Sequence, residues 1–571
     1  MFKKLLLPVL LITVFFGCSK KKEKVGPNNN DTTTTTINYG KTNTEHISVL
    51  TQHNDNTRAG LNNQESVLTT ANVNSSQFGA LFTLPVDDQV FAQPLVVANL
   101  PISSGVHNVV FIATVNNTVY AFDATKGNLY WHSNYTASGM RPPEAADMAS
   151  SWCTPYNNIS FNIGIIGTPV IDSVAQTIYF VARSTNGTNF VQYLHAVNLI
   201  DGTERSGSPV LITASVPGTG DGSVNNVVSF DPLRNNQRQG LTLVNGVVYI
   251  TWASHCDWNP YHGWIIGYDS KSLSQKIVYN DTPNGENGGI WESGMGMAAD
   301  AQGNLYVVTG NGTVGKSSSY KIPGNGTGET TASPDATDLS GRSESAMKLS
   351  PSGGTLQVSS YFTPTNYLDL NENDLDYGVM GTFLIPNSNY YFTGCKDGNL
   401  YLLNKDNMGS YSKSFNQVVQ TVFLNVNANL HCQPAYYKGS TSEFVYVWSE
   451  NDQLRALPFS GGSFSSTQGA ASGNGPNGQS GAVLSVSSNG TKTGTGILWA
   501  AYAASGDAEG TTSPGILRAF DASDITKELW NSGQTVSDNP GAYAKFSAPT
   551  IVNGHVYLAT FSNKVVVYGL K

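Results

Sequence analysis

The stretch TVYAFDATKGNLYW, residues 118–131, contains two short strands joined by a polar turn that Gly127 closes. Its apolar side chains alternate along the chain, which in a β-strand places them all on one face. Looser copies of the same pattern recur at residues 193–207, 263–279, 400–415 and 517–530. Each copy is interpreted as the last two strands of a four-stranded blade. Because one blade cannot bury both of its faces alone, the recurrence predicts a β-propeller in which neighbouring blades stack.

The composition is typical of an exported all-β protein rich in turns. The chain has 571 residues, of which 39% are hydrophobic and only 12% are charged, and it contains 58 glycines and 27 tyrosines. Such a chain is long enough to bury a large core, and the low charge is unusual for a cytosolic protein. The net charge of -9 offers no basic surface for phosphates, which argues against nucleic-acid binding.

The first residues have the features of an export signal. Lys3 and Lys4 precede an apolar run over residues 5–16, which is too short to span a bilayer. The stretch resembles a bacterial lipoprotein signal, in which cleavage before a cysteine, here Cys18, leaves that cysteine to carry the lipid. We therefore expect a signal peptide over residues 1–17, a flexible lipid-anchored tether over residues 18–45, and a single folded domain over residues 46–571.

The folded domain divides into eight expected blades, each with four antiparallel strands called A to D from the axis to the rim. The blades are expected to begin near Gln93, Thr168, Gly240, Gly294, Gly378, Gln433, Gly481 and Ala548. Several begin at an X-Pro pair, and proline is tolerated at the first residue of a strand. The last blade has only three strands before the chain ends. Residues 78–86, FGALFTLPV, are predicted to supply the fourth strand, so that the N-terminal strand closes the ring and no open edge remains.

The connections between strands indicate which end of the propeller carries function. The A-to-B and C-to-D turns are mostly short, whereas the D-to-A and B-to-C connections include long ones at residues 133–163, 214–238, 253–262, 310–343, 363–377 and 461–481. Strand alternation places both long types at the same end. Long loops gathered at one mouth of a rigid scaffold are where ligands usually bind.

Four cysteines fall in these mouth connections, in two pairs from adjacent blades. In an exported protein we predict disulfides between Cys153 and Cys256 and between Cys395 and Cys432. The alternative is that the cysteines are buried free thiols, which behave as small apolar side chains.

The repeated VYAFDATKGNLYW unit in an eight-bladed body resembles the repeat of pyrroloquinoline quinone (PQQ) dehydrogenases and of non-enzymatic PQQ-like propellers, including an outer-membrane assembly lipoprotein. The resemblance covers most of residues 78–571. In the dehydrogenases, PQQ lies on the axis over a calcium ion held by a Glu and an Asn. An Asp is the catalytic base, a basic side chain lies beside the quinone, a Trp lies beneath it, and two adjacent cysteines are bridged above it.

The resemblance assigns candidate roles to five residues. Asn311 in LYVVTGNGT matches the calcium-binding Asn, and Asp376 in the segment YFTPTNYLDLNENDLDYG matches the catalytic Asp. Asp374 and Asp376 of this acidic segment are, with Asn311, the candidate metal ligands. A solvated acidic loop is an alternative interpretation of the segment. Lys396 stands where the family has its basic residue, and Trp291 is the candidate for the ring floor.

Three parts of the family site are missing from the sequence. The expected Glu is absent because no acid lies between Ala182 and Ala196 in the second blade, no two cysteines are adjacent, and Gly294 or Gly296 stands where the Trp is expected. Trp291 would serve as the floor only with a shift of the backbone.

These departures favour a propeller with an eroded cofactor site that binds a glycan, a peptide or an envelope protein through its long-loop face. The alternative is a PQQ- and calcium-dependent dehydrogenase of an alcohol or sugar. An acid that converges from another blade onto Asn311 and Asp376 would favour the enzyme.

Overall fold

The computed structural model describes residues 46–148, 154–316, 333–425, 429–465, 469–470 and 475–571. The chain separates into two units, Met1–Lys41 and Thr42–Lys571, and the first lies wholly outside the described residues. The predicted signal peptide, the tether and Cys18 are therefore still predictions. Among the described residues, no helix has the length and apolar character needed to cross a membrane.

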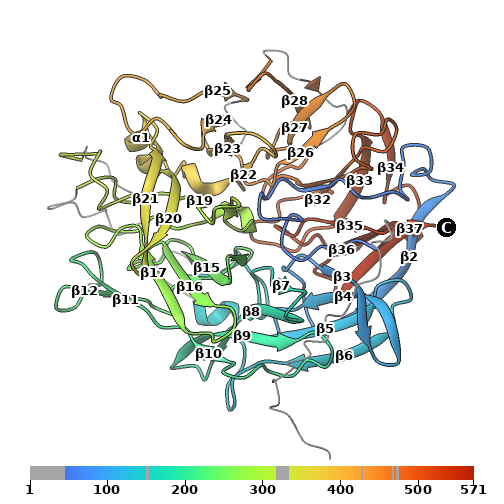
Figure 1. The fold of residues 1–571 in the computed structure, drawn as a ribbon, viewed down its shortest axis with the longest axis horizontal. Helices are drawn as coiled ribbons and strands as arrows, with labels where there is room; N and C mark the ends of the chain where they lie inside the picture. Colours follow the sequence, from blue (N-terminus) through green and yellow to red (C-terminus); the bar gives the residue numbers. More distant parts are fainter. Residues whose placement is uncertain (1–45, 149–153, 317–332, 426–428, 466–468, 471–474) are drawn as a thin grey trace, which may run out of the picture. The chain divides into compact units, whose positions relative to one another are not determined.

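Eight antiparallel sheets form an eight-bladed β-propeller, as the repeat predicts (Figure 1). Blades 1 to 4 consist of β3–β6 (Leu95–Ile102, Gly105–Ala113, Thr118–Asp123, Leu129–Asn134), β7–β10 (Val170–Asp172, Thr177–Thr185, Phe190–Asn198, Val210–Leu211), β14–β17 (Thr242–Val244, Val247–Ser254, Trp264–Asp269, Gln275–Asn280) and β18–β21 (Ala298–Ala299, Leu305–Val308, Ala346–Ser352, Thr355–Phe362). Blades 5 to 7 consist of β22–β25 (Phe383–Leu384, Tyr390–Gly394, Asn399–Asn404, Gln420–Phe423), β26–β30 (Ala435–Lys438, Glu443–Val447, Arg455–Ser460, Ser463–Phe464, Gly469–Ala470) and β31–β34 (Val483–Ser487, Ile497–Ala503, Gly515–Asp521, Glu528–Asn531). Each innermost strand begins within a few residues of its predicted start.

Blade 8 contains β35 (Thr550–Val552), β36 (His555–Ala559) and β37 (Lys564–Leu570), and its rim strand is β2 (Phe78–Pro85). β2 pairs antiparallel with β37 from Phe78 opposite Leu570 to Pro85 opposite Lys564, with a bulge near Phe82. The predicted closure by residues 78–86 is confirmed, and Figure 1 shows β2 beside β37 at the C-terminus. The first and last strands of the propeller therefore share one sheet.

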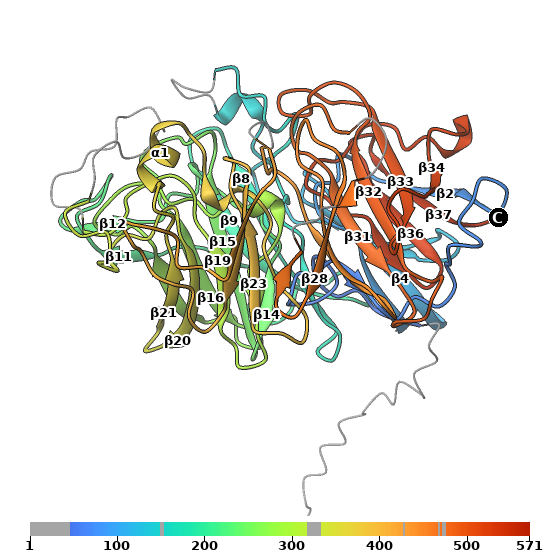
Figure 2. The same ribbon diagram turned by 90° about the horizontal axis from the view of Figure 1, so that it is seen from above.

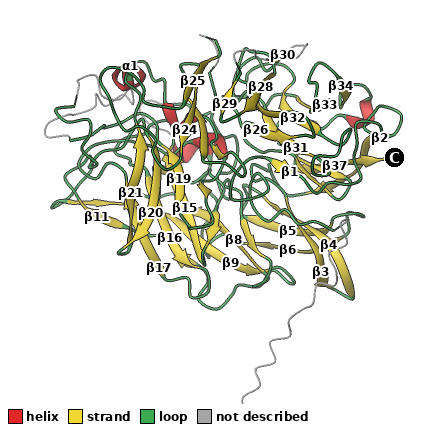
Figure 3. Cartoon of the chain, turned by 45° about the horizontal axis from the view of Figure 1, so that its top comes forward, coloured by secondary structure: helices red, strands yellow, loops and turns green. Residues whose placement is uncertain are grey.

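Helices are short and lie in the connections (Figure 3). Among the described residues there is one α-helix, α1 (Tyr367–Glu372), and there are 3-10 turns at Ala145–Met148, Glu292–Gly294, Tyr377–Val379 and Val536–Asp538. The remaining strands are β1 (Leu61–Asn62), β13 (Asn235–Asn236), which pairs with β15, and the hairpin β11–β12 (Ser215–Pro217 and Val227–Ser229). In Figure 2, α1 lies at the upper edge of the molecule, while the β20–β21 hairpin reaches the lower edge. The D-to-A connection that contains α1 and the C-to-D turn of blade 4 therefore lie at opposite ends of the propeller.

Tyrosines of the B strands link each of three blades to the next. The hydroxyl of Tyr179 donates a hydrogen bond to the carbonyl of Ser270 in blade 3 at 2.8 Å. Tyr557 of blade 8 donates in the same way to Ala124 of blade 1 at 2.8 Å, and Tyr446 of blade 6 donates to a blade 7 carbonyl. Each ring fills the apolar space between two sheets, and the hydroxyl finds an acceptor at the far side. The tyrosine-rich composition thus contributes directly to blade stacking.

Residues 46–62 form a belt inside the ring that the sequence does not predict. The belt bonds to the innermost strand of every blade in the order of the chain. Its partners from blade 1 to blade 8 are Val96, Ile171, Leu243, Ala299, Leu384, Tyr436, Val486 and Ile551. Innermost strands have one free edge facing the axis, and the belt satisfies backbone groups along that edge.

Arg58 fixes the belt to blades 3 and 4. Its side chain is fully buried, and its Nε donates to the carbonyl of Met297 at 3.1 Å. One terminal nitrogen donates within the belt to Thr51 and Gln52, each at 2.7 Å. The other donates to Leu241 at 3.1 Å and to Thr242 at 2.7 Å. A guanidinium with all of its donors used in this way is a cross-brace between chain segments that are far apart in sequence.

Candidate functional site

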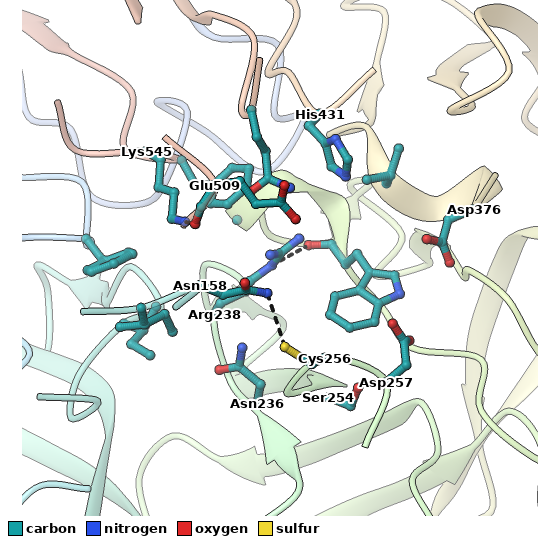
Figure 4. A pocket seen from close by; sticks show the side chains of 18 of the residues that line it. Asn158, Asn236, Arg238, Ser254, Cys256, Asp257, Asp376, His431, Glu509 and Lys545 are labelled. Carbon is teal, nitrogen blue, oxygen red and sulfur yellow. Dashed lines mark hydrogen bonds between the residues drawn. The ribbon is translucent and has the colours of Figure 1, made fainter. Parts of the chain in front are cut away.

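A pocket of about 260 Å³ opens on the propeller axis at the long-loop end (Figure 4). Its lining residues all come from D-to-A or B-to-C connections or from the adjoining ends of strands, as the loop lengths predict. They are Phe91, Tyr156, Asn158, Ile159, Ile166, Thr168, Asn236, Arg238, Ser254, Cys256, Asp257, Trp291, Gly294, Asp374, Asp376, Val379, Lys396, Asn429, His431, Glu450, Gln479, Asp507, Glu509, Lys545 and Phe546. These side chains come from connections of all eight blades, so the pocket exists only when the ring is closed.

The belt lies directly behind the pocket floor. Gly294 lines the pocket, and two residues further on the backbone N–H of Gly296 donates to Gln52 Oε1 at 3.3 Å. A side chain at Gly296 would come within 2.7 Å of an Arg58 nitrogen. The floor loop and the belt are therefore packed against each other, so the pocket is closed on this side of the axis.

Asn311, Asp376 and Lys396 come together although they lie in three separate connections. The backbone N–H of Asn311 donates to Asp376 Oδ1 at 2.8 Å, and the Lys396 ammonium lies 2.6 Å from Asp376 Oδ2. Asn311 Oδ1 is buried and has no hydrogen-bond partner among the described residues. The amide oxygen that the resemblance assigns to a cation is thus available, while both oxygens of Asp376 already have partners.

Asp374 completes this cluster. It accepts a hydrogen bond from Asn311 Nδ2 at 2.6 Å, and its other oxygen lies 3.3 Å from Lys396 Nζ. Burial raises the pKa of Asp374, and repulsion by Asp376 adds to that effect. Burial lowers the pKa of Lys396, but the attraction of Asp376 and Asp374 outweighs it, so the pKa lies above its ordinary value. Lys396 is therefore a permanent cation that neutralises part of the acidic cluster.

Asp257, to which the resemblance assigns no role, also belongs to the acidic side of the pocket. It lies in the B-to-C connection of blade 3 and accepts a hydrogen bond from the Tyr261 hydroxyl at 2.6 Å. Burial, with repulsion by Asp376 and Asp374, raises its pKa to about 7. This is an acid from another blade near the predicted pair. The sequence near Asp257 does not indicate this proximity, because Asp374 and Asp376 are more than 100 residues away.

The described residues do not assemble the full set that PQQ and calcium would require. The turn between β8 and β9 contains no acid, and among the described residues no group of three His, Cys, Asp or Glu side chains is arranged to hold a metal ion. Trp291 lines the pocket, but the Arg238 guanidinium lies over its ring, 5.2 Å from the centroid. A ring stacked on that face of Trp291 would have to displace a cation. As they stand, the residues do not fit the cofactor.

The predicted disulfide between Cys395 and Cys432 is wrong. Both cysteines are free and fully buried. Cys395 Sγ donates to the carbonyl of Leu375 at 3.1 Å, and Cys432 belongs to the apolar core between blades 5 and 6. Both connections reach the mouth, but the thiols lie in different cores, that of Cys395 between blades 4 and 5 and that of Cys432 between blades 5 and 6, so the alternative of buried thiols holds for this pair. Cys256 is in a disulfide. Its predicted partner, Cys153, lies outside the described residues, so that pairing is still a prediction.

A histidine and a glutamate form a second titratable pair at the pocket wall. His431 Nδ1 lies 2.7 Å from Glu450 Oε1, and both side chains line the pocket. Burial lowers the pKa of His431 well below its ordinary value, whereas burial and then repulsion by Asp507 raise the pKa of Glu450 to about 8. Near neutral pH the pair therefore shares a proton without exposing a net charge to the pocket.

The floor loop also contains a buried acid, Glu292, which makes stability depend on pH. Its Oε1 accepts from the Val308 N–H at 3.1 Å and from the Thr382 hydroxyl at 3.4 Å, whereas Oε2 has no partner among the described residues. Burial raises its pKa from 4.5 to about 8. The contribution of this group to stability is therefore complete below pH 4.5 and is lost as the pH rises through about 8.

We expect Glu292→Gln to remove this loss. Urea unfolding midpoints at pH 5 and pH 8 measure it: the unchanged protein should lose more stability over that interval than the variant, and at pH 8 the variant should be the more stable of the two. Exposed Glu144→Gln is the control and should leave the pH dependence unaltered. An equal loss of stability in the unchanged protein and in Glu292→Gln would show that the Glu292 carboxyl is ionised at little cost.

Comparison with known proteins gives the same fold. No protein-family model matches the sequence, and a search of curated proteins gives no match. Among solved structures, the quinohemoprotein alcohol dehydrogenase from Comamonas testosteroni superposes with a TM-score of 0.56 at 12% identity, over 92% of this chain and 80% of that one. A quinohemoprotein alcohol dehydrogenase from Pseudomonas putida HK5 gives 0.54 at 11% identity, again over 92% and 80%. BamB from Moraxella catarrhalis gives 0.46 at 11% identity, over 86% and 99%. At these identities the two dehydrogenase structures show the β-propeller fold alone.

Proposed function

We propose that this protein is an exported PQQ-like β-propeller, held to a membrane of the cell envelope by a lipid on Cys18, that binds a small charged molecule in its axial pocket. The anchor and the location rest on the sequence of residues 1–18. The binding role rests on one observation: a pocket closed by the belt on one side gathers charged side chains from the connections of several blades. Envelope glycans, peptides or proteins that present such a molecule are the expected partners.

Several features support a binding role. Pocket walls built from the loops of a rigid ring are largely pre-formed, which lowers the entropy cost of binding. Charged side chains of the pocket wall form ion pairs with one another, as Lys396 does with Asp374 and Asp376. Buried ionisable groups with displaced pKa values gather at functional sites more often than elsewhere. Asp257, Glu450 and Lys545 are three such groups in one pocket.

Thermal unfolding of the unchanged protein with a panel of neutral sugars, amines, carboxylates and phosphates tests the proposal. We expect saturable stabilisation by at least one class. Asn158→Trp, which fills part of the pocket, should abolish the effect. Asn157→Trp is the matched control, because Asn157 is exposed and is not among the pocket lining. Stabilisation that survives in Asn158→Trp would place binding elsewhere, and no stabilisation by any class would contradict the proposal.

A PQQ- and calcium-dependent dehydrogenase is the second candidate. The convergence of Asn311, Asp376 and Lys396, together with Asp257 from another blade, favours it. The same unfolding assay with PQQ and calcium separates the two candidates when it is combined with dye-linked alcohol oxidation. Stabilisation that needs both additions, with turnover lost in Asp376→Asn, would make the enzyme the better assignment. No response to PQQ would leave the binding propeller.

A further inference from the structure

Two cationic side chains line the pocket without an ion-pair partner. Lys545 lies in the connection into blade 8 and is only 4% exposed, and Arg238 lies in the connection into blade 3. Among the described residues, neither forms a salt bridge. Burying a cation without a counter-charge costs desolvation free energy, which the binding of an anion would offset. Figure 4 shows Lys545 and Asp376 at opposite edges of the pocket, with Arg238 between them.

Both cations keep donors that no protein group uses. The Lys545 ammonium donates to the carbonyls of Ala508 and Glu509, at 2.9 and 2.6 Å, which occupies two of its three N–H groups. Arg238 Nε donates to the carbonyl of Trp291 at 3.3 Å. Its two terminal nitrogens have no hydrogen-bond partner among the described residues. The unused donors belong to side chains that face one cavity, which is the arrangement that a carboxylate needs.

The guanidinium is held in place before any ligand arrives. It lies 5.2 Å from the ring centroid of Trp291 and 4.6 Å from that of Phe546. The loops that carry these rings are tied together, because Gln433 Nε2 donates to the Phe546 carbonyl at 2.8 Å and to the Ser293 carbonyl at 2.7 Å. A cation fixed between two rings loses little side-chain entropy when it binds an anion.

The wall next to these cations is apolar. Phe91, Tyr156, Ile159 and Ile166 line the pocket and belong to one buried cluster. Among the described residues, no acid of the pocket forms an ion pair with Arg238 or Lys545. Asp374 and Asp376 are paired with Lys396, and Glu450 is paired with His431. Asp507 and Glu509 are exposed, where water screens their charge. Asp257 is buried without a cation partner too, so the pocket has an acidic side, with Asp257, Asp374 and Asp376, as well as the two cations.

We propose that this pocket binds a small organic carboxylate with an apolar body, whose carboxylate lies between Arg238 and Lys545 and whose body packs against the apolar wall. The assignment rests on the binding role proposed above and names its ligand class. Neither cation corresponds to a position that the sequence resemblance singles out. A phosphate or a neutral ring would satisfy only one of the two features, because the first lacks an apolar body and the second lacks the charge.

Benzoate and benzamide are the probes, because they share a ring and a shape and differ in charge. Titration calorimetry with the unchanged protein should give measurable binding of benzoate and at least tenfold weaker binding of benzamide. Arg238→Met and Lys545→Met should each weaken benzoate binding about tenfold or more, because a charge-assisted hydrogen bond is worth about 1.5–3 kcal/mol. Lys527→Met, at an exposed lysine in the C-to-D turn of blade 7, is the control and should not alter binding.

Proton uptake gives a second readout. Burial lowers the pKa of Lys545 to about 7, with a further contribution from Arg238, while Glu509 and Asp507 oppose the decrease. A bound carboxylate favours the charged ammonium, so benzoate binding at pH 8 should take up a proton, and this uptake should be smaller in Lys545→Met. Asp257 and Glu450, with pKa values of about 7 and about 8, supply the remaining uptake, because a bound anion favours their protonated forms. Calorimetry in two buffers of different ionisation enthalpy measures it.

Equal affinity for benzoate and benzamide in the unchanged protein would overturn the assignment, and this result does not depend on how either variant folds. Benzoate binding that persists in both methionine variants would also overturn it. If other ligand classes bind and benzoate does not, the carboxylate assignment fails while the binding role stands. If no class of the panel binds, both fail.

Discussion

Arg58→Met should lower the free energy of unfolding by about 3 kcal/mol or more, because it removes five buried hydrogen bonds, three of them to carbonyls, each worth about 0.5–1.5 kcal/mol net. Those carbonyls belong to Gln52, Leu241 and Met297. Methionine keeps much of the volume but none of the donors. The variant does not have to remove a guanidinium from water when it folds, and this offsets part of the cost. The shift of the urea unfolding midpoint, taken with the unchanged slope, measures the difference.

Arg141→Met is the matched control for this change. Arg141 is half exposed and pairs with Asp147 on the surface, where such pairs contribute about 0–1 kcal/mol. If Arg58→Met shifted stability no more than Arg141→Met does, the belt would not brace the ring, and residues 46–62 would be a dispensable extension. A large effect would assign a structural role to a segment that has no repeat of its own.

Phe78→Ala should cost about 3–5 kcal/mol of unfolding free energy, the usual range for removing a buried phenylalanine. Phe78 begins the closing strand β2 and is fully buried among three aromatic rings. Its ring centroid lies 5.5 Å from that of Trp499, 5.0 Å from that of Trp530 and 6.5 Å from that of Tyr568. The first two rings belong to blade 7 and the third to blade 8, so this side chain packs across the seam where the ring closes.

Thermal and urea unfolding of Phe78→Ala and Phe78→Leu test the closure. Leucine refills part of the cavity and should recover part of the loss. Phe415→Ala is the control, since Phe415 is 64% exposed and should tolerate the change. A loss below about 1 kcal/mol in Phe78→Ala would indicate that the seam between blades 7 and 8 is held by other contacts, chiefly the β2–β37 pairing.

The candidate site was predictable in part. Asn311, Asp376 and Lys396 carry local signals, a strand followed by a turn or an acidic segment, and the structure brings them within hydrogen-bonding distance. Arg238 and Lys545 carry no such signal. Each is a single basic residue in a long connection. Its role depends on which side chains of other connections, far away in the sequence, lie beside it. The Cys395–Cys432 pairing failed for a related reason, because loop position does not fix the direction of a side chain.

The alternating strands, their turns and the three-stranded last blade determine by themselves the eight-bladed ring and its closure by residues 78–86. These are local patterns of burial and backbone geometry, and each blade repeats them. Only the tertiary structure decides that residues 46–62 run round the axis, that Asp257 faces Asp376, and that two cations are left without partners in one pocket. Such relations depend on where eight blades place their loops in space, and no stretch of sequence contains that information alone.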